Sequence, residues 1–157
     1  MKKQQQGKRV AVIEGWFTLD SRDAHLIGNR CKACGDYFFP KAMGCRNPDC
    51  MQEDLEQVFL SKRGKLWSYT NNYYPPPPPY VSQNPFVPYA TVVVELAREK
   101  LMVLGPLADG YDFEALEAGM EMELVVEPLY IDESGNEHLI WKFKPALFGS
   151  KVKGGKR

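Results

Sequence analysis

The chain has 157 residues and carries 20 acidic and 20 basic side chains, so its formal charge at pH 7 is zero. This length allows one small metal-held module and one domain of about 100 residues. No apolar run approaches the ~20 residues that span a bilayer, and the N-terminal residues lack the apolar segment of a secretory signal. We therefore expect a cytoplasmic protein with no membrane partner.

The charges are unevenly distributed along the chain. Residues 1–9 and 151–157 hold four bases each and no acid, which leaves twelve bases against twenty acids in residues 10–150. Nucleic-acid-binding domains concentrate Lys and Arg on their working face, so this acidic body argues against a nucleic-acid partner. We expect residues 1–9 and 149–157 to be disordered basic tails.

Residues 10–60 form the first predicted domain. The apolar residues between Val10 and Asn29 have mixed spacing, which favours a short helical lead-in followed by a strand that enters the cysteine cluster. His25 precedes that strand, and we expect it to have a surface or packing role because the four cysteines already fill a metal site.

All four cysteines lie within twenty residues, in the pattern C-K-A-C-G followed by a second pair: Cys31, Cys34, Cys45 and Cys50. Two close pairs of thiolates can surround Zn²⁺ tetrahedrally and leave it no open position, so we predict a structural zinc ribbon of the rubredoxin type. Two disulfides, four unrelated thiols and a four-cysteine iron site are the alternatives. The second pair is separated by four residues, where two are more common.

The second predicted domain covers residues 61–148 and has the strand order of an OB fold. Strands are expected at 66–70, 89–97, 100–104, 120–126 and 138–143, with a single helical turn capped by Asp112 between the third and the fourth. Five strands with a helix in that place are typical of an OB barrel. The sequence thus predicts a mainly β protein, with an N-terminal zinc ribbon followed by a five-stranded OB-fold barrel.

A proline-rich insertion at residues 75–88 interrupts the barrel after its first strand. Prolines cannot donate hydrogen bonds to a sheet, so the segment should run as an extended polyproline helix. Tyrosines are favoured in interfaces, and we predict a partner contact formed by Tyr73, Tyr74, Pro75, Pro76, Pro77, Pro78, Pro79 and Tyr80. A stiff loop that only connects two strands is the alternative.

Several stretches together resemble a family of zinc-ribbon and OB-fold proteins that accompany acyl-CoA enzymes. They are C-K-A-C-G, S-K-R-G-K-L-W-S-Y-T, P-Y-A-T-V-V-V-E-L, L-G-P-L, G-M-E-M-E-L and W-K-F-K-P, which cover about residues 16–147. The Y-Y-P-P-P-P-P-Y insertion and the G-N-E-H-L-I-W-K-F-K-P ending most resemble small subunits of thiolases in anaerobic toluene degradation. The resemblance implies a hetero-oligomer with a thiolase-fold catalytic subunit and a CoA thioester as shared ligand.

Within that family, basic residues at the start of the barrel become candidates for contacts to CoA phosphates. The S-K-R-G-K stretch is predicted to be a turn that groups three of them, and an aromatic residue follows; the candidates are Lys62, Arg63, Lys65 and Trp67. A solvated turn is the alternative for the bases, and a core position is the alternative for the tryptophan.

The chain offers no catalytic set of its own. A thiolase needs a nucleophilic cysteine and a histidine that activates it, and zinc would occupy all four cysteines. The second histidine, His138, reads as an ordinary strand residue. We therefore predict a non-catalytic but required thiolase subunit. The alternatives are a subunit of another acyl-CoA enzyme, of the hydratase or hydroxymethylglutaryl-CoA synthase type, and a module that binds single-stranded nucleic acid.

Overall fold

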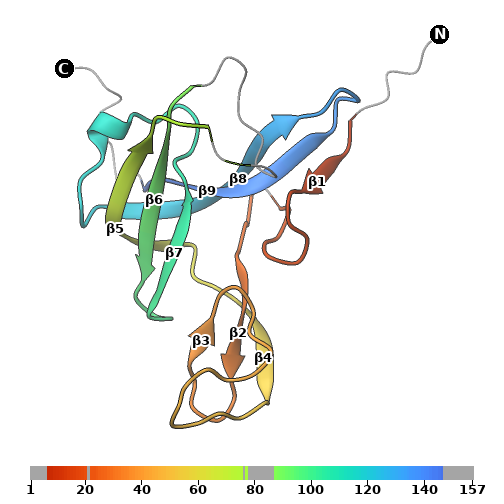
Figure 1. Ribbon diagram of the computed structural model, residues 1–157, viewed down its shortest axis with the longest axis vertical. Coiled ribbons are helices and arrows are strands. Elements are labelled where there is room, and N and C mark those ends of the chain that lie inside the picture. The colour runs from red at the N-terminus through yellow and green to blue at the C-terminus, as the bar shows by residue number, and fades with distance from the viewer. Residues whose placement is uncertain (1–6, 21, 76, 78–86, 147–157) are drawn as a thin grey trace.

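The computed structural model describes residues 7–20, 22–75, 77 and 87–146. Within them the protein is built of β-strands and one short 3₁₀ turn, which confirms the predicted fold class (Figure 1). The elements are β1 (Arg9–Ala11), β2 (Ile27–Cys31), β3 (Tyr37–Phe38), β4 (Leu55–Phe59), β5 (Arg63–Asn72), β6 (Tyr89–Leu96), β7 (Leu101–Pro106), η1 (Phe113–Ala115), β8 (Glu121–Ile131) and β9 (Glu137–Pro145).

The smaller sheet is the ribbon, which lies at one end of the molecule in Figure 1. Its strand order is β3-β2-β4, and both pairs are antiparallel. Strand β2 is central and delivers Cys31 at its last position, opposite Leu55 of β4. The predicted strand into the first cysteine is confirmed, and β3 pairs with it on one side.

The larger sheet is the barrel, with the strand order β1-β9-β8-β5-β6-β7. All five predicted barrel strands are present, in the antiparallel pairs expected of consecutive hairpins. A parallel bridge between Leu107 and Phe143 brings the end of β7 beside β9, so the sheet curves into a barrel. The predicted helical turn is η1, and the side chain of Asp112 accepts a hydrogen bond from the amide of Glu114.

The barrel core follows the alternation of its strands. Met122, Leu124 and Val126 of β8 are buried, while Glu123 and Val125 between them are only half-buried. They pack with Val92 and Val94 of β6 in one hydrophobic cluster. An alternating strand with a buried apolar face is the pattern that specifies strand register.

The predicted helical lead-in is wrong. Val10 and Ala11 lie in β1, which pairs in parallel with the last strand, opposite His138 and Leu139. Further along, Phe17 forms an antiparallel bridge with Leu26, so this segment is extended up to the ribbon. A partner more than a hundred residues away decides the conformation here, and such tertiary contacts override weak local preferences.

The predicted tail at residues 1–9 is shorter than expected. The amide of Lys8 donates to Asn136 Oδ1 at 2.9 Å, and Arg9 forms an ion pair with Glu137 at 3.3 Å. Residues 7–9 are therefore docked on the β8–β9 hairpin. Residues 1–6 and the predicted tail at 149–157 lie outside the described part of the chain.

The predicted S-K-R-G-K turn is also wrong, because β5 already begins at Arg63. Gly64 sits inside this strand, where an added Cβ would collide with the carbonyl oxygen of Glu95 on β6. The glycine is thus needed for the close approach of two strands and not for a turn.

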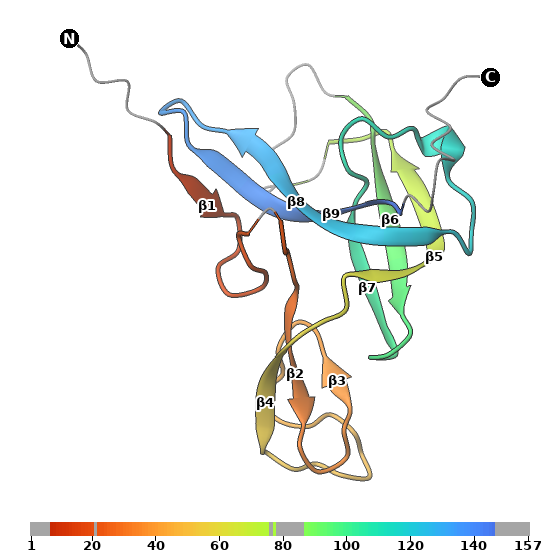
Figure 2. The ribbon, with the colours of Figure 1, turned by 180° about the vertical axis from the view of Figure 1, so that it is seen from behind.

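Aromatic side chains join the ribbon to the barrel. Phe39, just after β3, lies 5.6 Å from the ring of Trp16 and 5.8 Å from that of Trp141 on β9. Trp16 stacks on Trp141 at 6.0 Å, and Phe17 meets Trp141 edge-on at 5.7 Å. We call these four residues the aromatic junction. Figure 2 shows the ribbon below the barrel at this point, reached by the segment after β1 and by the short connection from β4 to β5.

Candidate metal centre and junction groove

The four cysteines converge as predicted. Their Sγ atoms all lie within 4.8 Å of one another, and the closest pairs are Cys31 with Cys50 at 3.7 Å and Cys34 with Cys45 at 3.6 Å. A tetrahedral zinc site with bonds of about 2.3 Å has sulfur–sulfur edges of about 3.8 Å. The all-thiolate donor set and its spacing therefore fit a structural zinc ion.

The first knuckle is a tight turn after β2. The amide of Gly35 donates to the carbonyl of Cys31 at 2.9 Å, and the amide of Cys31 donates to Asp36 O at 2.8 Å. Gly35 has a φ of +84°, a conformation that a residue with a side chain rarely adopts. The glycine lets Cys31 and Cys34 face the same point.

The longer second knuckle forms a turn of its own. The carbonyl of Asn47 accepts hydrogen bonds from the amides of Cys50 and Met51, both at 3.0 Å, and the Asn47 side chain caps the turn by accepting from Asp49 N. The amide of Cys45 donates to Gln52 O at 2.8 Å. The two extra residues are absorbed in this turn, so the second pair still presents both sulfurs inward.

A buried asparagine anchors the loop between the knuckles. Asn29 of β2 is 6% exposed; its side chain donates to Ala42 O at 2.7 Å and accepts from Ala42 N at 3.1 Å. Both polar ends of the side chain are satisfied, as a buried amide requires.

The local environment shifts the pKa values of the cysteine thiols in opposite directions. The backbone amide of Cys34 lowers the pKa of Cys31 to about 7, whereas burial raises the pKa of Cys45 to about 12. The Gln52 amide lowers the pKa of Cys50, but burial and its interactions with Cys31 and Cys34 prevail and the pKa lies above its ordinary value. A bound cation would favour the thiolate form at all four positions.

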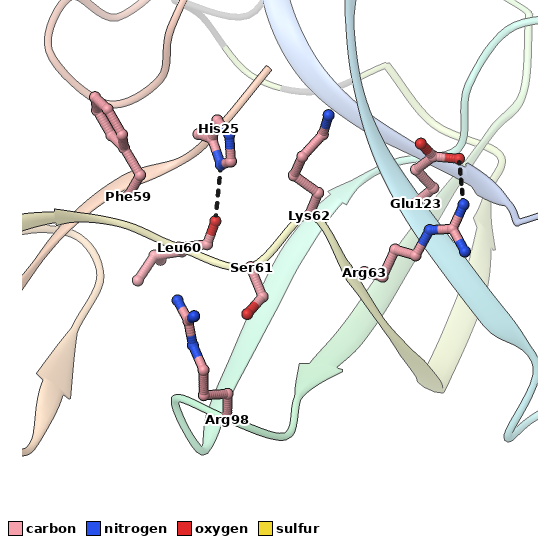
Figure 3. Close-up of a pocket in the computed structure, with 8 residues that line it drawn as sticks. All are labelled: His25, Phe59, Leu60, Ser61, Lys62, Arg63, Arg98 and Glu123. Carbon is pink, nitrogen blue, oxygen red and sulfur yellow. Dashed lines mark hydrogen bonds and ion pairs between the residues drawn. The ribbon is translucent and has the colours of Figure 1, made fainter. Parts of the chain in front are cut away.

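A second candidate site is an open groove of about 680 Å³ at the connection from ribbon to barrel. We call it the junction groove; it is lined by His25, Phe59, Leu60, Ser61, Lys62, Arg63, Arg98 and Glu123 (Figure 3). Its floor is the three-residue linker between β4 and β5, and residues from three other segments surround it.

Several groups in the junction groove are already paired. Lys62 contacts Asp23 at 3.0 Å and thereby lowers the pKa of that carboxyl. Arg63 lies 3.8 Å from Glu123. His25 lies with Nδ1 3.1 Å from the Leu60 carbonyl and Nε2 3.2 Å from Asp23, and its ring stacks on Phe59 at 5.5 Å. The packing role predicted for His25 fits these contacts.

The structure separates the predicted CoA residues. Lys62 and Arg63 line the junction groove, whereas Lys65 and Trp67 lie farther along β5, both exposed and outside its lining. Trp67 is 60% exposed and sits at a register shift of β5, so the alternative of a core position is wrong for it.

The predicted interface segment is only partly described. Tyr73 and Tyr74 follow β5 and are 65% and 83% exposed, and Pro75 and Pro77 are exposed as well. Pro76, Pro78, Pro79 and Tyr80 lie outside the described residues.

Sequence reasoning missed Phe59 and Arg98 as groove residues and Glu99 as a buried acid. Arg98 and Glu99 lie at the short connection between the predicted strands 89–97 and 100–104, where nothing in the sequence indicates a buried acid. The Glu99 side chain is nevertheless fully buried. The signal for this, a hydroxyl donor at Ser61, lies 38 residues earlier in the chain.

His138 belongs to a polar turn at the tip of the β8–β9 hairpin. Its Nε2 lies 2.9 Å from Asp132 Oδ2, and its ring stacks on Tyr130 at 4.3 Å. Asp132 also accepts hydrogen bonds from the amides of Ser134 and Asn136. The bond with His138, the largest contribution, and those from Asn136 hold the pKa of Asp132 well below its ordinary value.

No helix in the described part of the chain is long and apolar enough to cross a membrane.

Comparisons with known proteins agree with this architecture. The family model of the ChsH2 C-terminal OB-fold domain matches residues 57–127. A solved structure described as the Ltp2-ChsH2(DUF35) aldolase is similar, with a TM-score of 0.57 and 28% identity over 78% of this chain and 86% of that one.

Curated relatives match in sequence. The DUF35 domain-containing scaffold protein of Methanocaldococcus jannaschii is 32% identical over 141 residues, 85% of this chain and 90% of that protein. The benzoylsuccinyl-CoA thiolase subunit BbsA of Thauera aromatica is 48% identical over 54 residues, which span 34% of this chain and 36% of the relative. The protein of the same name in Geobacter metallireducens is 32% identical over 76% of this chain and 74% of the relative.

The shared OB-fold domain and the similarity over most of the archaeal scaffold protein lead to one conclusion: the chain belongs to the DUF35 family, with the OB-fold C-terminal domain described for ChsH2.

Proposed function

We propose that the chain is a non-catalytic but required subunit of a heteromeric thiolase and that it helps to bind or enclose a CoA thioester. The observation that carries the proposal is the convergence of all four cysteines of the chain on one cluster. A closed four-thiolate shell around zinc leaves no thiol to accept an acyl group. The chemistry then belongs to a thiolase-fold partner.

The proposed substrate is benzoylsuccinyl-CoA, cleaved to benzoyl-CoA and succinyl-CoA in the cytoplasm during anaerobic toluene degradation. The names of the Thauera aromatica and Geobacter metallireducens relatives support this substrate. So do the proline-flanked tyrosines and the last strand, on which the resemblance to such thiolase subunits rested.

In this proposal the junction groove holds the phosphates of CoA. Lys62 and Arg63 line it and can exchange their carboxylate partners for phosphate oxygens, which likewise accept charge-assisted hydrogen bonds from Lys and Arg. Lys65 and Trp67 would meet the ligand beyond the groove, along β5. The exposed tyrosines Tyr73 and Tyr74, with the proline run, would contact the catalytic partner.

A second candidate is an accessory subunit of a different acyl-CoA enzyme, of the hydratase or hydroxymethylglutaryl-CoA synthase type. It is favoured by relatives named scaffold proteins and by the structural similarity to an aldolase complex. Both candidates assign the same role to this chain and differ in the reaction of the partner.

The test is reconstitution. The tagged chain is purified with the protein that accompanies it, and benzoylsuccinyl-CoA cleavage is measured for the chain, for the partner and for the complex. We expect turnover only by the complex. Cleavage by the isolated chain, or full activity of the partner without it, would refute the proposal. A complex that is active on another CoA thioester alone would establish the second candidate.

A further inference from the structure

The hairpin between β6 and β7 carries a buried carboxylate beside an exposed guanidinium. The Glu99 side chain is 0% exposed, whereas that of Arg98 is 65% exposed. Arg98 Nε donates to Glu99 Oε1 at 2.9 Å. One end of the arginine is therefore attached to a rigid part of the hairpin while the rest reaches solvent.

Glu99 is held more tightly than a turn residue usually is. Its Oε1 also accepts hydrogen bonds from the amide of Ser61 at 3.0 Å and from the Ser61 hydroxyl at 2.7 Å. Burial raises the pKa of Glu99, but these hydrogen bonds and that of Arg98 outweigh burial, so the pKa lies below its ordinary value. The acid is thus ionised at neutral pH and couples the hairpin to the linker.

The second carboxylate oxygen of Glu99 adds to the cost of burying this acid. Glu99 Oε2 is buried and receives no hydrogen bond from the described residues. A buried charge with an unsatisfied oxygen is costly, and an apolar residue would avoid that cost. A role in holding its neighbours is a physical reason for keeping the acid in this place.

Arg98 differs from the other bases of the junction groove in what its polar atoms contact. Lys62 is engaged by Asp23 and Arg63 by Glu123, while the interactions of Arg98 within the described residues use Nε only. Figure 3 shows its guanidinium rising from the hairpin toward the linker, on the opposite side from Lys62. Nε is therefore fixed by Glu99, while the two terminal nitrogens of this lining residue point toward the linker.

We propose that Arg98, positioned by Glu99, is the anion anchor of the junction groove and binds a phosphate group of the ligand through its two terminal nitrogens. A guanidinium fork matches two phosphate oxygens, and a fork already held at Nε loses little freedom on binding. The inference rests on the proposed function for the identity of the ligand, because a CoA phosphate and a free phosphate offer the same chemistry.

The experiment is a calorimetric titration of the full chain with adenosine 3′,5′-bisphosphate, with adenosine and inorganic phosphate as parallel probes. We expect Arg98→Gln to weaken bisphosphate binding about tenfold, the loss typical of one strong charge-assisted contact. Arg98→Lys should restore only part of it, because an ammonium lacks the fork. Tight binding of inorganic phosphate alone would identify a free anion as the ligand, whereas a preference for the bisphosphate identifies the nucleotide part of CoA.

Glu99→Gln tests the positioning role. It keeps the size of the side chain but removes the charge that holds Arg98 Nε, so bisphosphate binding should weaken severalfold. The double variant Arg98→Gln/Glu99→Gln removes both charges together and guards against unfolding caused by an uncompensated buried acid. It should bind no more weakly than Arg98→Gln. The control is Lys100→Gln on the same hairpin, an exposed residue outside the groove lining, which should bind like the wild type.

Equal bisphosphate binding by Arg98→Gln and Lys100→Gln would overturn the inference. So would a wild-type chain that binds neither the bisphosphate nor phosphate, or an effect of Arg98→Gln confined to assembly with the partner. The proposed function is judged separately, by turnover of the reconstituted complex, so either conclusion can fail alone.

Discussion

The ribbon and the barrel keep their shapes by different means. In the barrel the fully buried side chains are large and apolar, among them Leu66, Met122 and Phe143. Between Cys31 and Cys50 the only buried residues are two cysteines and Ala42. Burial of so little apolar surface cannot offset the chain entropy of twenty residues, so we expect the ribbon to depend on a bound metal and the barrel to fold without one.

Loss of one metal ligand should give the largest effect, because it should unfold the ribbon and leave the barrel intact. Cys34→Ser removes one thiolate, and structural zinc contributes on the order of 10 kcal/mol to the folding of small modules. We expect zinc content to fall and the backbone resonances of residues 27–59 to collapse, while those of β6 and β8 persist in an NMR spectrum. Met43→Ser is the control, because Met43 lies in the same loop and is 100% exposed. Loss of the barrel resonances as well would show that the two parts fold as one.

Truncation of the barrel core is the reciprocal test. Phe143 is 1% exposed, and removal of such a ring usually costs about 3–5 kcal/mol. Phe143→Ala should lower the free energy of unfolding of the barrel by about that amount, measured by urea denaturation of tryptophan fluorescence. Bound zinc per chain, measured at low urea, should stay the same. A fall in zinc content would contradict the independence of the ribbon.

The aromatic junction tests how firmly the two parts are joined. Phe39→Ala removes two ring contacts, each of which contributes about 0.5–1.5 kcal/mol beyond buried area. We expect a smaller loss of stability than for Phe143→Ala and increased motion of the ribbon relative to the barrel, visible as different rotational correlation times in ¹⁵N relaxation. Phe38→Ala is the control, since Phe38 has no ring contact within the junction. Equal correlation times for both parts in Phe39→Ala would show that the linker alone holds them together.

The smallest expected effect is a pH dependence confined to the barrel. The pKa of Asp132 is lowered in the folded state, so its contribution to stability is complete above the unfolded pKa of about 4 and is lost as pH falls further. Urea denaturation between pH 7 and pH 2.5 should show this decline in the wild type. Asp132→Asn should flatten that part of the profile and leave zinc binding at pH 7 unchanged. An identical acid profile for the variant would assign the decline to other carboxyls.

Elements governed by neighbouring residues were predictable from the sequence. The cysteine spacing predicted the cluster, alternation predicted β8, and Asp112 predicted the start of η1, because each of these signals lies within a few residues of its effect. The OB fold followed from the order of such local elements. The knuckle of unusual length was equally local, since Asn47 supplies the capping atoms itself.

The features that could not be predicted depend on distant partners. The segment that forms β1 was predicted to be helical because the spacing of nearby residues carries no information about its distant partner β9. The burial of Glu99 could not be predicted, because its hydrogen-bond donor, Ser61, belongs to the linker far earlier in the chain. The junction groove is likewise assembled from four separate segments, and only its Lys62 and Arg63 stood out as a cluster of bases. The sequence identified a basic stretch, but only the fold shows which of its bases line the junction groove.

The pairing of β1 with β9 has a consequence for the order in which the molecule can form. Arg9 lies opposite Glu137 of β9, so β1, the first described strand, has no sheet partner until β9, the last described strand, is in place. The ribbon, by contrast, has all its ligands by Cys50. During synthesis the metal module can close while most of the barrel is still missing, and β1 remains an open edge until β9 arrives. Contacts of such sequence separation are slow to form, which makes docking of the earliest strand a natural final step of folding.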